Sequence, residues 1–159
     1  MTFTARRSSY SYRQSIHGAA DQVFSLLCPV REAAWLDGWT YSMVWSASGV
    51  AEEGVVFTTP QDGEPDTVWV FTRHDPVGRE IDFARFTPGS RICAVRLRVA
   101  SAGPETSHVD ISYAYTGLSD AGNAWIDAYT DREFLEMARR WERSMNHSLR
   151  TGTKLVERR

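Results

Sequence analysis

Cysteines and long apolar runs are scarce in this sequence of 159 residues. Two cysteines, Cys28 and Cys93, are too few for a disulfide framework, so we expect a reduced, cytoplasmic protein. No apolar run approaches the roughly 20 residues that a transmembrane helix needs. The polar start of the chain also lacks the apolar segment of a secretory signal. We therefore expect no integral membrane association.

An excess of charge of either sign is also missing. The chain has 18 basic and 20 acidic residues and a formal net charge of −2, which is too balanced for electrostatic capture of nucleic acid. A hydrophobic fraction of 42% and a charged fraction of 24% are ordinary for a globular protein and exclude a disordered or collagen-like chain. The length predicts one domain over residues 1–159, large enough to bury a core without disulfides or metals.

Motifs that would indicate a metal, a cofactor or a nucleophile do not occur in the sequence. The four histidines and two cysteines show no paired ligand spacing, so we expect no metal. No G-x-S-x-G, dinucleotide-binding or phosphate-loop motif is present, so we expect no cofactor and assign no catalytic residue. His74 is either a turn residue or an acid or base at a pocket rim. Cys28 is either a packed residue or a thiol activated at the start of a helix.

The arrangement of apolar residues predicts an α+β fold. A first strand at 4–16 is followed by two short helices at 19–27 and 29–36, because Pro29 suits a helix start and disfavours helical backbone before it. The period then changes to two, with tight turns between strands, as in an antiparallel meander. The predicted strands of this meander are 40–46, 55–59, 67–74, 80–86, 91–100 and 108–116, and a short helix is compatible with 121–128.

The C-terminal segment carries the clearest helix signal. Thr130 and Glu133 fit a capping box, and Tyr129 and Phe134 fit the hydrophobic staple around it. Gly152 is placed to end the helix. Such a helix has one apolar face, opposite a face with several arginines, and is roughly 30 Å long. We therefore expect it to span the whole sheet.

A curved sheet opposite a straight helix raises the question of what fills the space between them. A seven-stranded sheet twists and curls, so it can part from the helix in the middle. Met137, Ala138, Met145 and Ser148 on the helix are small or flexible and leave room. Aromatic residues, however, make up 12% of the chain. Both an open cavity and a dry, aromatic core fit this pattern.

Four parts of the sequence are characteristic: residues 23–32 with Trp35 and 37–39, residues 49–52 with 56–59, residues 117–123, and residues 146–152. Together they resemble a bacterial branch of the SRPBCC, or START-like helix-grip, superfamily. The resemblance covers nearly the whole chain and implies a seven-stranded sheet that grips the C-terminal helix around a hydrophobic cavity. Relatives by this resemblance include plant ligand binders, lipid-transfer domains, polyketide cyclases or aromatases, and activators of a heat-shock chaperone. The branch itself implies no particular reaction.

The aromatic content and the resemblance together favour binding of a small hydrophobic or aromatic molecule between sheet and helix. The tyrosine hydroxyls and Ser148 would orient this ligand, and Arg85, at the end of its strand, is a candidate contact for an anionic group. The inward faces of strands 55–59 and 67–74 are open to a shift of one residue, which would exchange their lining. The predicted lining residues are Met43, Trp45, Phe57, Phe83, Tyr113, Tyr115, Phe134, Met137, Trp141, Met145 and Ser148.

Two other functions fit the sequence less well. A cyclase, aromatase or dehydratase that acts in the same cavity needs a titratable group there, and Tyr113, Tyr115 and Arg85 are the candidates. A chaperone-activating module needs a contiguous exposed apolar patch, which the polar face of the C-terminal helix does not suggest. The sequence leaves open the identity of the ligand and the choice between a monomer and a homodimer.

Overall fold

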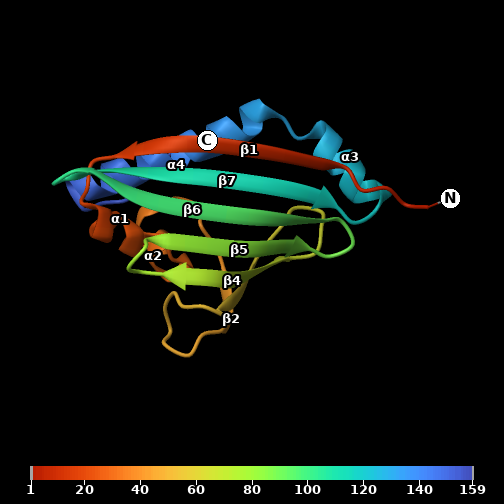
Figure 1. Ribbon diagram of the computed structural model, residues 1–159, viewed down its shortest axis with the longest axis horizontal. Helices are drawn as coiled ribbons and strands as arrows, with labels where there is room; N and C mark the ends of the chain where they lie inside the picture. The colour runs from red at the N-terminus through yellow and green to blue at the C-terminus, as the bar shows by residue number, and fades with distance from the viewer. Residues whose placement is uncertain (1, 159) are drawn as a thin grey trace.

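Seven antiparallel strands form one curved sheet, with the helices on one side of it, in a computed structural model that describes residues 2–158 (Figure 1). The strand order is β1-β7-β6-β5-β4-β3-β2, so every neighbouring pair except β1 and β7 is consecutive in the chain. This arrangement confirms the expected α+β helix-grip architecture. The strands are β1 (Arg7–Ile16), β2 (Ser42–Trp45), β3 (Val56–Thr59), β4 (Thr67–Asp75), β5 (Glu80–Thr87), β6 (Arg91–Gly103) and β7 (Thr106–Gly117), and the helices are α1 (Ala20–Leu26), α2 (Pro29–Trp35), α3 (Asp120–Ala128) and α4 (Asp131–Thr151).

The core lies on the concave face of the sheet, where alternate residues of each strand point. In the central pair, Val95 is opposite Tyr113 and Leu97 is opposite Ile111, and all four side chains are buried. The residues between them point to the convex face and are more exposed. Buried and more exposed residues therefore alternate along β6 and β7, as the two-residue period of the sequence predicts.

Helix α4 runs along the concave side of the sheet, behind β1 and β7 in Figure 1. Its capping box forms as predicted, since the Thr130 hydroxyl accepts from the Glu133 amide and the Glu133 carboxylate accepts from the Thr130 amide. Gly152 ends the helix with a φ of 71°, in the left-handed region that glycine adopts readily. None of the helices in the described part of the chain combines the length and the apolar character that a membrane span requires.

Polar side chains join α4 to the edge strand β1. The buried Gln14 amide donates to the Ala138 carbonyl at 2.9 Å. One turn further along α4, the Glu142 carboxylate accepts from the Tyr12 hydroxyl at 2.8 Å and from the Ser15 amide at 2.6 Å. These bonds hold α4 to one edge of the sheet.

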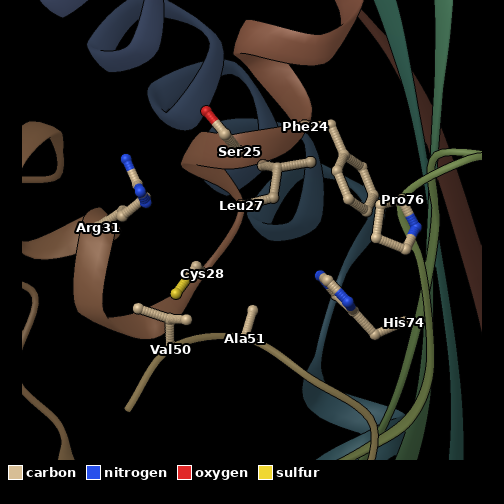
Figure 2. Close-up of a pocket in the computed structure, with 9 residues that line it drawn as sticks. All are labelled: Phe24, Ser25, Leu27, Cys28, Arg31, Val50, Ala51, His74 and Pro76. Carbon is tan, nitrogen blue, oxygen red and sulfur yellow. The ribbon is translucent and has the colours of Figure 1, made fainter. Parts of the chain in front are cut away.

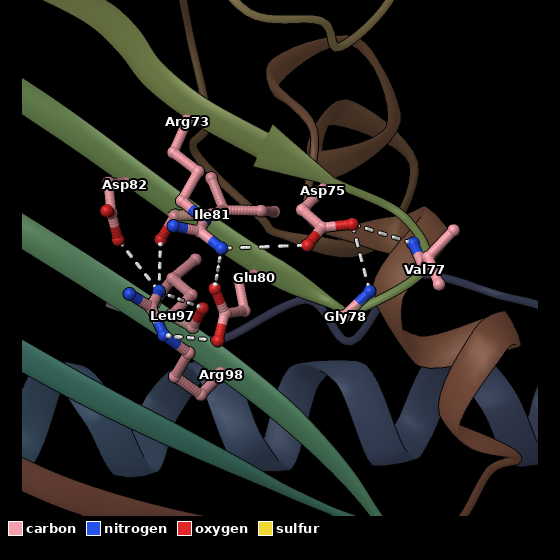
Figure 3. Close-up of polar contacts among 9 residues, drawn as sticks. All are labelled: Arg73, Asp75, Val77, Gly78, Glu80, Ile81, Asp82, Leu97 and Arg98. Carbon is pink, nitrogen blue, oxygen red and sulfur yellow. Dashed lines mark hydrogen bonds and ion pairs between the residues drawn. The ribbon is translucent and has the colours of Figure 1, made fainter.

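The convex face carries charged residues paired across strands (Figure 3). Arg98 on β6 reaches Asp82 at 2.7 Å and Glu80 at 3.5 Å on β5, and Arg73 on β4 also pairs with Glu80. The Asp75 carboxylate closes the β4–β5 turn by accepting from the amides of the two residues at 77 and 78. Exposed pairs of this kind contribute only about 0–1 kcal/mol each. They keep the convex face polar, and the apolar side chains lie on the concave face.

The start of α3 packs tightly against the β5–β6 turn. The Ser119 hydroxyl caps α3 and donates to the Gly89 carbonyl at 2.6 Å, and the Leu118 amide donates to the Ser90 carbonyl at 2.7 Å. A Cβ atom at Gly122 would overlap with the backbone carbonyl of Ser90. Only glycine therefore allows this close approach of helix and turn.

We expect Gly122→Ala to lower the free energy of unfolding by about 1–3 kcal/mol, the range for overpacking of a closely packed site. Urea denaturation followed by circular dichroism measures the effect. Ala124→Ser, at an exposed position of the same helix, is the control and should change the value by no more than about 0.5 kcal/mol. Equal effects of the two substitutions would contradict the close packing of α3 on the turn.

Candidate functional site

The space between α4 and the concave face of the sheet is almost filled. It retains a small interior cavity, in which the centre of a water molecule could occupy a volume of about 10 Å³. This is room for about one water molecule. Pockets for drug-sized ligands are on the order of 300–1,000 Å³. Of the two alternatives that the sequence leaves open, aromatic packing describes this conformation better than an open cavity. The cavity walls are Glu32, Trp39, Phe57, Trp69, Phe83, Val95, Leu97, Tyr113 and Trp141.

Aromatic side chains from β3, β4 and β5 account for this filling. Phe57 stacks on Trp69 with ring centroids 5.4 Å apart, and the edge of Phe83 meets Trp69 at 5.6 Å. Phe71 and Phe83 are closer still, at 4.4 Å. Contacts at these distances are favourable beyond the burial of apolar area. The three strands therefore place a cohesive aromatic cluster on the concave face of the sheet.

Glu32 is the one acidic residue on the cavity wall. It lies on α2 between Pro29 and Trp35, three residues from each, and this helical spacing puts all three side chains on the buried face. Its carboxyl group has no hydrogen-bond or ion-pair partner within residues 2–158. Burial raises the pKa of Glu32 to about 8. The group is therefore largely a neutral carboxylic acid at pH 7, able to donate a hydrogen bond into the cavity.

Tyr113 places a second unpartnered polar group on the same wall. The side chain is fully buried on β7, and its hydroxyl forms no hydrogen bond with any residue described. Burial raises the pKa of the Tyr113 phenol, and the positive charge of Arg85 nearby opposes that rise in part. The phenol therefore keeps its proton at neutral pH. A buried hydroxyl without a partner costs about 1–3 kcal/mol, and a bound molecule can offset that cost.

The predicted lining residues divide into three groups in the structure. Phe57, Phe83, Tyr113 and Trp141 line the interior cavity. Tyr115, Phe134 and Met145 are buried in the surrounding core, and Met43, Met137 and Ser148 are half-buried at its border; none of these six is on the cavity wall.

Trp45 is a correction to the sequence analysis. Alternation from Tyr41 predicts that its side chain points inward, but Trp45 is 54% exposed. The cause is an irregularity in β2: Met43 is opposite Phe57, whereas Trp45 is opposite Val56, so the register shifts between the two. A shift of one residue moves every later side chain to the other face of a strand.

The sequence analysis missed five residues of the cavity wall. Val95 and Leu97 belong to the apolar alternation of β6, which does not separate cavity wall from core. Trp69 lies in a strand with apolar residues on both sides, so the sequence does not determine which of them point inward. The Trp39 indole donates to the Pro29 carbonyl at 2.9 Å, and the side chain also lines the cavity. Glu32 had a detectable signal, because an acidic residue between Pro29 and Trp35 lies on the apolar face of its helix.

A larger, open pocket lies outside the core, between α1, α2, the β2–β3 loop and the β4–β5 turn (Figure 2). It has a volume of about 200 Å³ and mostly apolar walls. His74 lies on one side, between the rings of Phe24 at 5.3 Å and Phe71 at 5.9 Å, and burial lowers its pKa. Cys28, also on the wall, is buried as a packed residue would be. The pocket is lined by Phe24, Ser25, Leu27, Cys28, Arg31, Val50, Ala51, His74 and Pro76.

Comparison with known proteins establishes the fold. No family model and no curated protein matches the sequence. Norcoclaurine synthase from Thalictrum flavum, solved in complex with dopamine and hydroxybenzaldehyde, is 14% identical, with 87% of this chain and 86% of that chain covered and a TM-score of 0.64. Zhui aromatase/cyclase from Streptomyces sp. R1128 is 12% identical over 94% of this chain and 100% of its own, with a TM-score of 0.63. A hypothetical protein from Helicobacter pylori is 7% identical over 88% and 86%, with a TM-score of 0.68. The helix-grip fold implied by the resemblance is therefore confirmed.

The Glu32→Gln substitution should make the free energy of unfolding less dependent on pH. Because burial raises the pKa of Glu32 from 4.5 to about 8, the unfolded state releases its proton first as the pH rises. Between these two pKa values, the free energy of unfolding of the wild type should therefore fall by about 1.4 kcal/mol per pH unit. The variant should not show this decrease. Urea denaturation at pH 5.5 and pH 8 gives the comparison, with the exposed Glu53→Gln as a control that follows wild type. An equal stability difference at both pH values would refute an uncompensated buried Glu32.

Tyr113→Phe should raise the free energy of unfolding by about 1 kcal/mol, because it removes a buried hydroxyl without a partner. Tyr12→Phe is the matched comparison: it removes a hydroxyl that donates to Glu142 at 2.8 Å, and it should lower the same quantity by a similar amount. Thermal or urea denaturation of wild type and both variants measures these changes in the free energy of unfolding. A loss of stability in Tyr113→Phe as large as in Tyr12→Phe would mean that the Tyr113 hydroxyl is satisfied in the folded protein.

Proposed function

We propose that the protein binds a small hydrophobic or aromatic molecule between the sheet and α4. The observation that carries this proposal is the pairing of two unpartnered polar groups, Glu32 and Tyr113, on one aromatic-walled cavity. A site of this composition suits a ligand with an apolar body and a polar substituent. Apolar contact would drive binding at about 25 cal/mol per Å² of buried area, and the two polar groups would orient the ligand.

Entry of such a ligand requires side chains to move, because the cavity has room for about one water molecule. Trp39 and Trp141 are suited to this movement. Both are half-buried, and neither belongs to the sheet: Trp39 lies between α2 and β2, and Trp141 lies on α4. Their displacement would open the cavity without breaking the strand pairing of its other walls.

The structural neighbours are consistent with a ligand of this size. Norcoclaurine synthase was solved with dopamine and hydroxybenzaldehyde, two aromatic molecules. We extend that ligand size, though not the reaction, to the interior site of this chain. Both cysteines are free thiols in the interior, which suits the reducing cytoplasm that we propose as the compartment.

A second candidate, a cyclase-, aromatase- or dehydratase-like enzyme, is favoured by one observation. Glu32 adds to the candidates from the sequence a carboxyl group on the cavity wall, with a pKa of about 8. A carboxyl group with a pKa near the working pH can give a proton to a leaving oxygen or take one from carbon. If the protein is such an enzyme, Glu32→Gln should abolish turnover and retain substrate binding. Loss of binding together with turnover would instead assign Glu32 to ligand binding.

We expect saturable binding of 4-hydroxybenzaldehyde, measured by quenching of tryptophan fluorescence and by chemical-shift changes in ¹H–¹⁵N spectra. Tyr113→Phe should weaken binding about 5- to 10-fold, because it removes a hydrogen bond worth about 1 kcal/mol. Tyr12→Phe, whose hydroxyl faces Glu142 instead of the cavity, is the control and should bind like wild type. If a panel of neutral aromatic compounds gives no saturable response at millimolar concentration, the proposed function is wrong.

A further inference from the structure

Arg85 is a charged residue within a row of otherwise apolar or aromatic residues on the concave face. This row runs across neighbouring strands from Trp69 on β4 to Arg85 on β5, Cys93 on β6 and Tyr115 on β7, each opposite the next. The guanidinium carbon of Arg85 lies 4.8 Å from the centroid of the Trp69 ring, which itself lines the interior cavity. The strand register therefore places a positive charge beside Trp69, a wall residue of the proposed ligand site.

No group in the described chain neutralises this charge. The guanidinium has no hydrogen-bond acceptor and no carboxylate partner within residues 2–158. The groups that act on it most strongly are the phenols of Tyr115 and Tyr113 and the thiol of Cys93. Burial raises the pKa of all three, that of Cys93 to about 12, so all three are neutral at pH 7. Arg85 is therefore a half-buried cation without a counterion on the concave face.

Arg91, a second arginine on the concave face, has a carboxylate partner. Arg91 is 3% exposed, and its guanidinium binds both carboxylate oxygens of Glu64, at 2.9 and 3.1 Å. It also lies 3.7 Å from the centroid of the Trp125 ring. Arg85 has the aromatic contact but lacks the carboxylate. This contrast makes the missing anion at Arg85 a specific feature of the site.

We propose that Arg85 binds a carboxylate group of the ligand, so that the ligand class is a small aromatic carboxylic acid. This inference rests on the proposed function, since it uses the same site. A guanidinium presents parallel N–H donors that match the two oxygens of a carboxylate. The unpartnered Tyr113 hydroxyl is a further donor nearby. Glu32, protonated below pH 8, adds no negative charge that would repel the ligand.

The experiment compares two probes of nearly equal shape, 4-hydroxybenzoate and 4-hydroxybenzamide, with the full-length protein at pH 6.5. Isothermal titration calorimetry should show at least tenfold tighter binding of the carboxylate. Arg85→Met, which keeps an unbranched side chain and removes the charge, should lose this preference and still bind the amide. Arg96→Met, at an exposed position on the convex face of the neighbouring strand, is the charge-matched control and should keep the preference.

A second measurement needs no variant: the Nε–Hε resonance of Arg85 in the wild-type protein should shift on titration with 4-hydroxybenzoate and not with the amide. Equal affinity for both probes would overturn the carboxylate site and leave the proposed function intact. Failure of both probes to bind would overturn both proposals. If Arg96→Met loses the preference as fully as Arg85→Met, the effect comes from net charge, and the assignment to Arg85 is wrong.

Discussion

The attachment of α4 to the edge strand β1 is the constraint on which the interior site depends. Gln14 and Glu142 anchor the helix to one side of the concave face. The inner surface of β3, β4 and β5, on the other side, is then covered by α2 and by aromatic side chains, including Trp39 and Trp141. The cavity lies under this second cover, which is held by packing more than by hydrogen bonds to the sheet. The helix α4 is thus fixed to one edge of the sheet by side-chain hydrogen bonds, and the opposite wall is closed by aromatic packing.

Polar groups without partners are concentrated in this part of the core. Glu32, Tyr113 and Arg85 come from α2, β7 and β5, three elements distant in sequence, and each would be replaced at a gain in stability by an apolar residue of similar size. Gln14 and Arg91, elsewhere in the interior, have hydrogen-bond partners, whereas the buried Nδ1 atom of His108 has none within the described residues. Sites that sacrifice stability locally are where proteins bind or transform ligands. The three residues are also chemically complementary: two neutral donors and one cation suit an acceptor-rich ligand.

Local signals in the sequence predicted the fold well, because each element has a strong and independent cause. The capping box of Thr130 and Glu133 sets the start of α4, and alternation over many residues sets the faces of β6 and β7. The site was harder to predict. Trp45 points outward because of a backbone irregularity that leaves no mark in the alternation. The spacing of Glu32 from Pro29 and Trp35 indicates the buried face of α2, but it does not show that this face borders a cavity. The size of the cavity depends on how the rings of three strands interlock, which a one-dimensional pattern does not contain.

The irregular register of β2 also affects how the molecule meets other chains. An outermost strand offers a row of free amide and carbonyl groups on which a foreign strand can add, and long, flat edges of this kind promote fibrous assembly. At the border opposite β1, the outermost strand β2 has only four residues, and its pairing is interrupted between Met43 and Trp45. Such a short, bent border is a poor template for further growth. The same distortion that displaces an aromatic ring from the interior therefore protects the protein from aggregation through this edge.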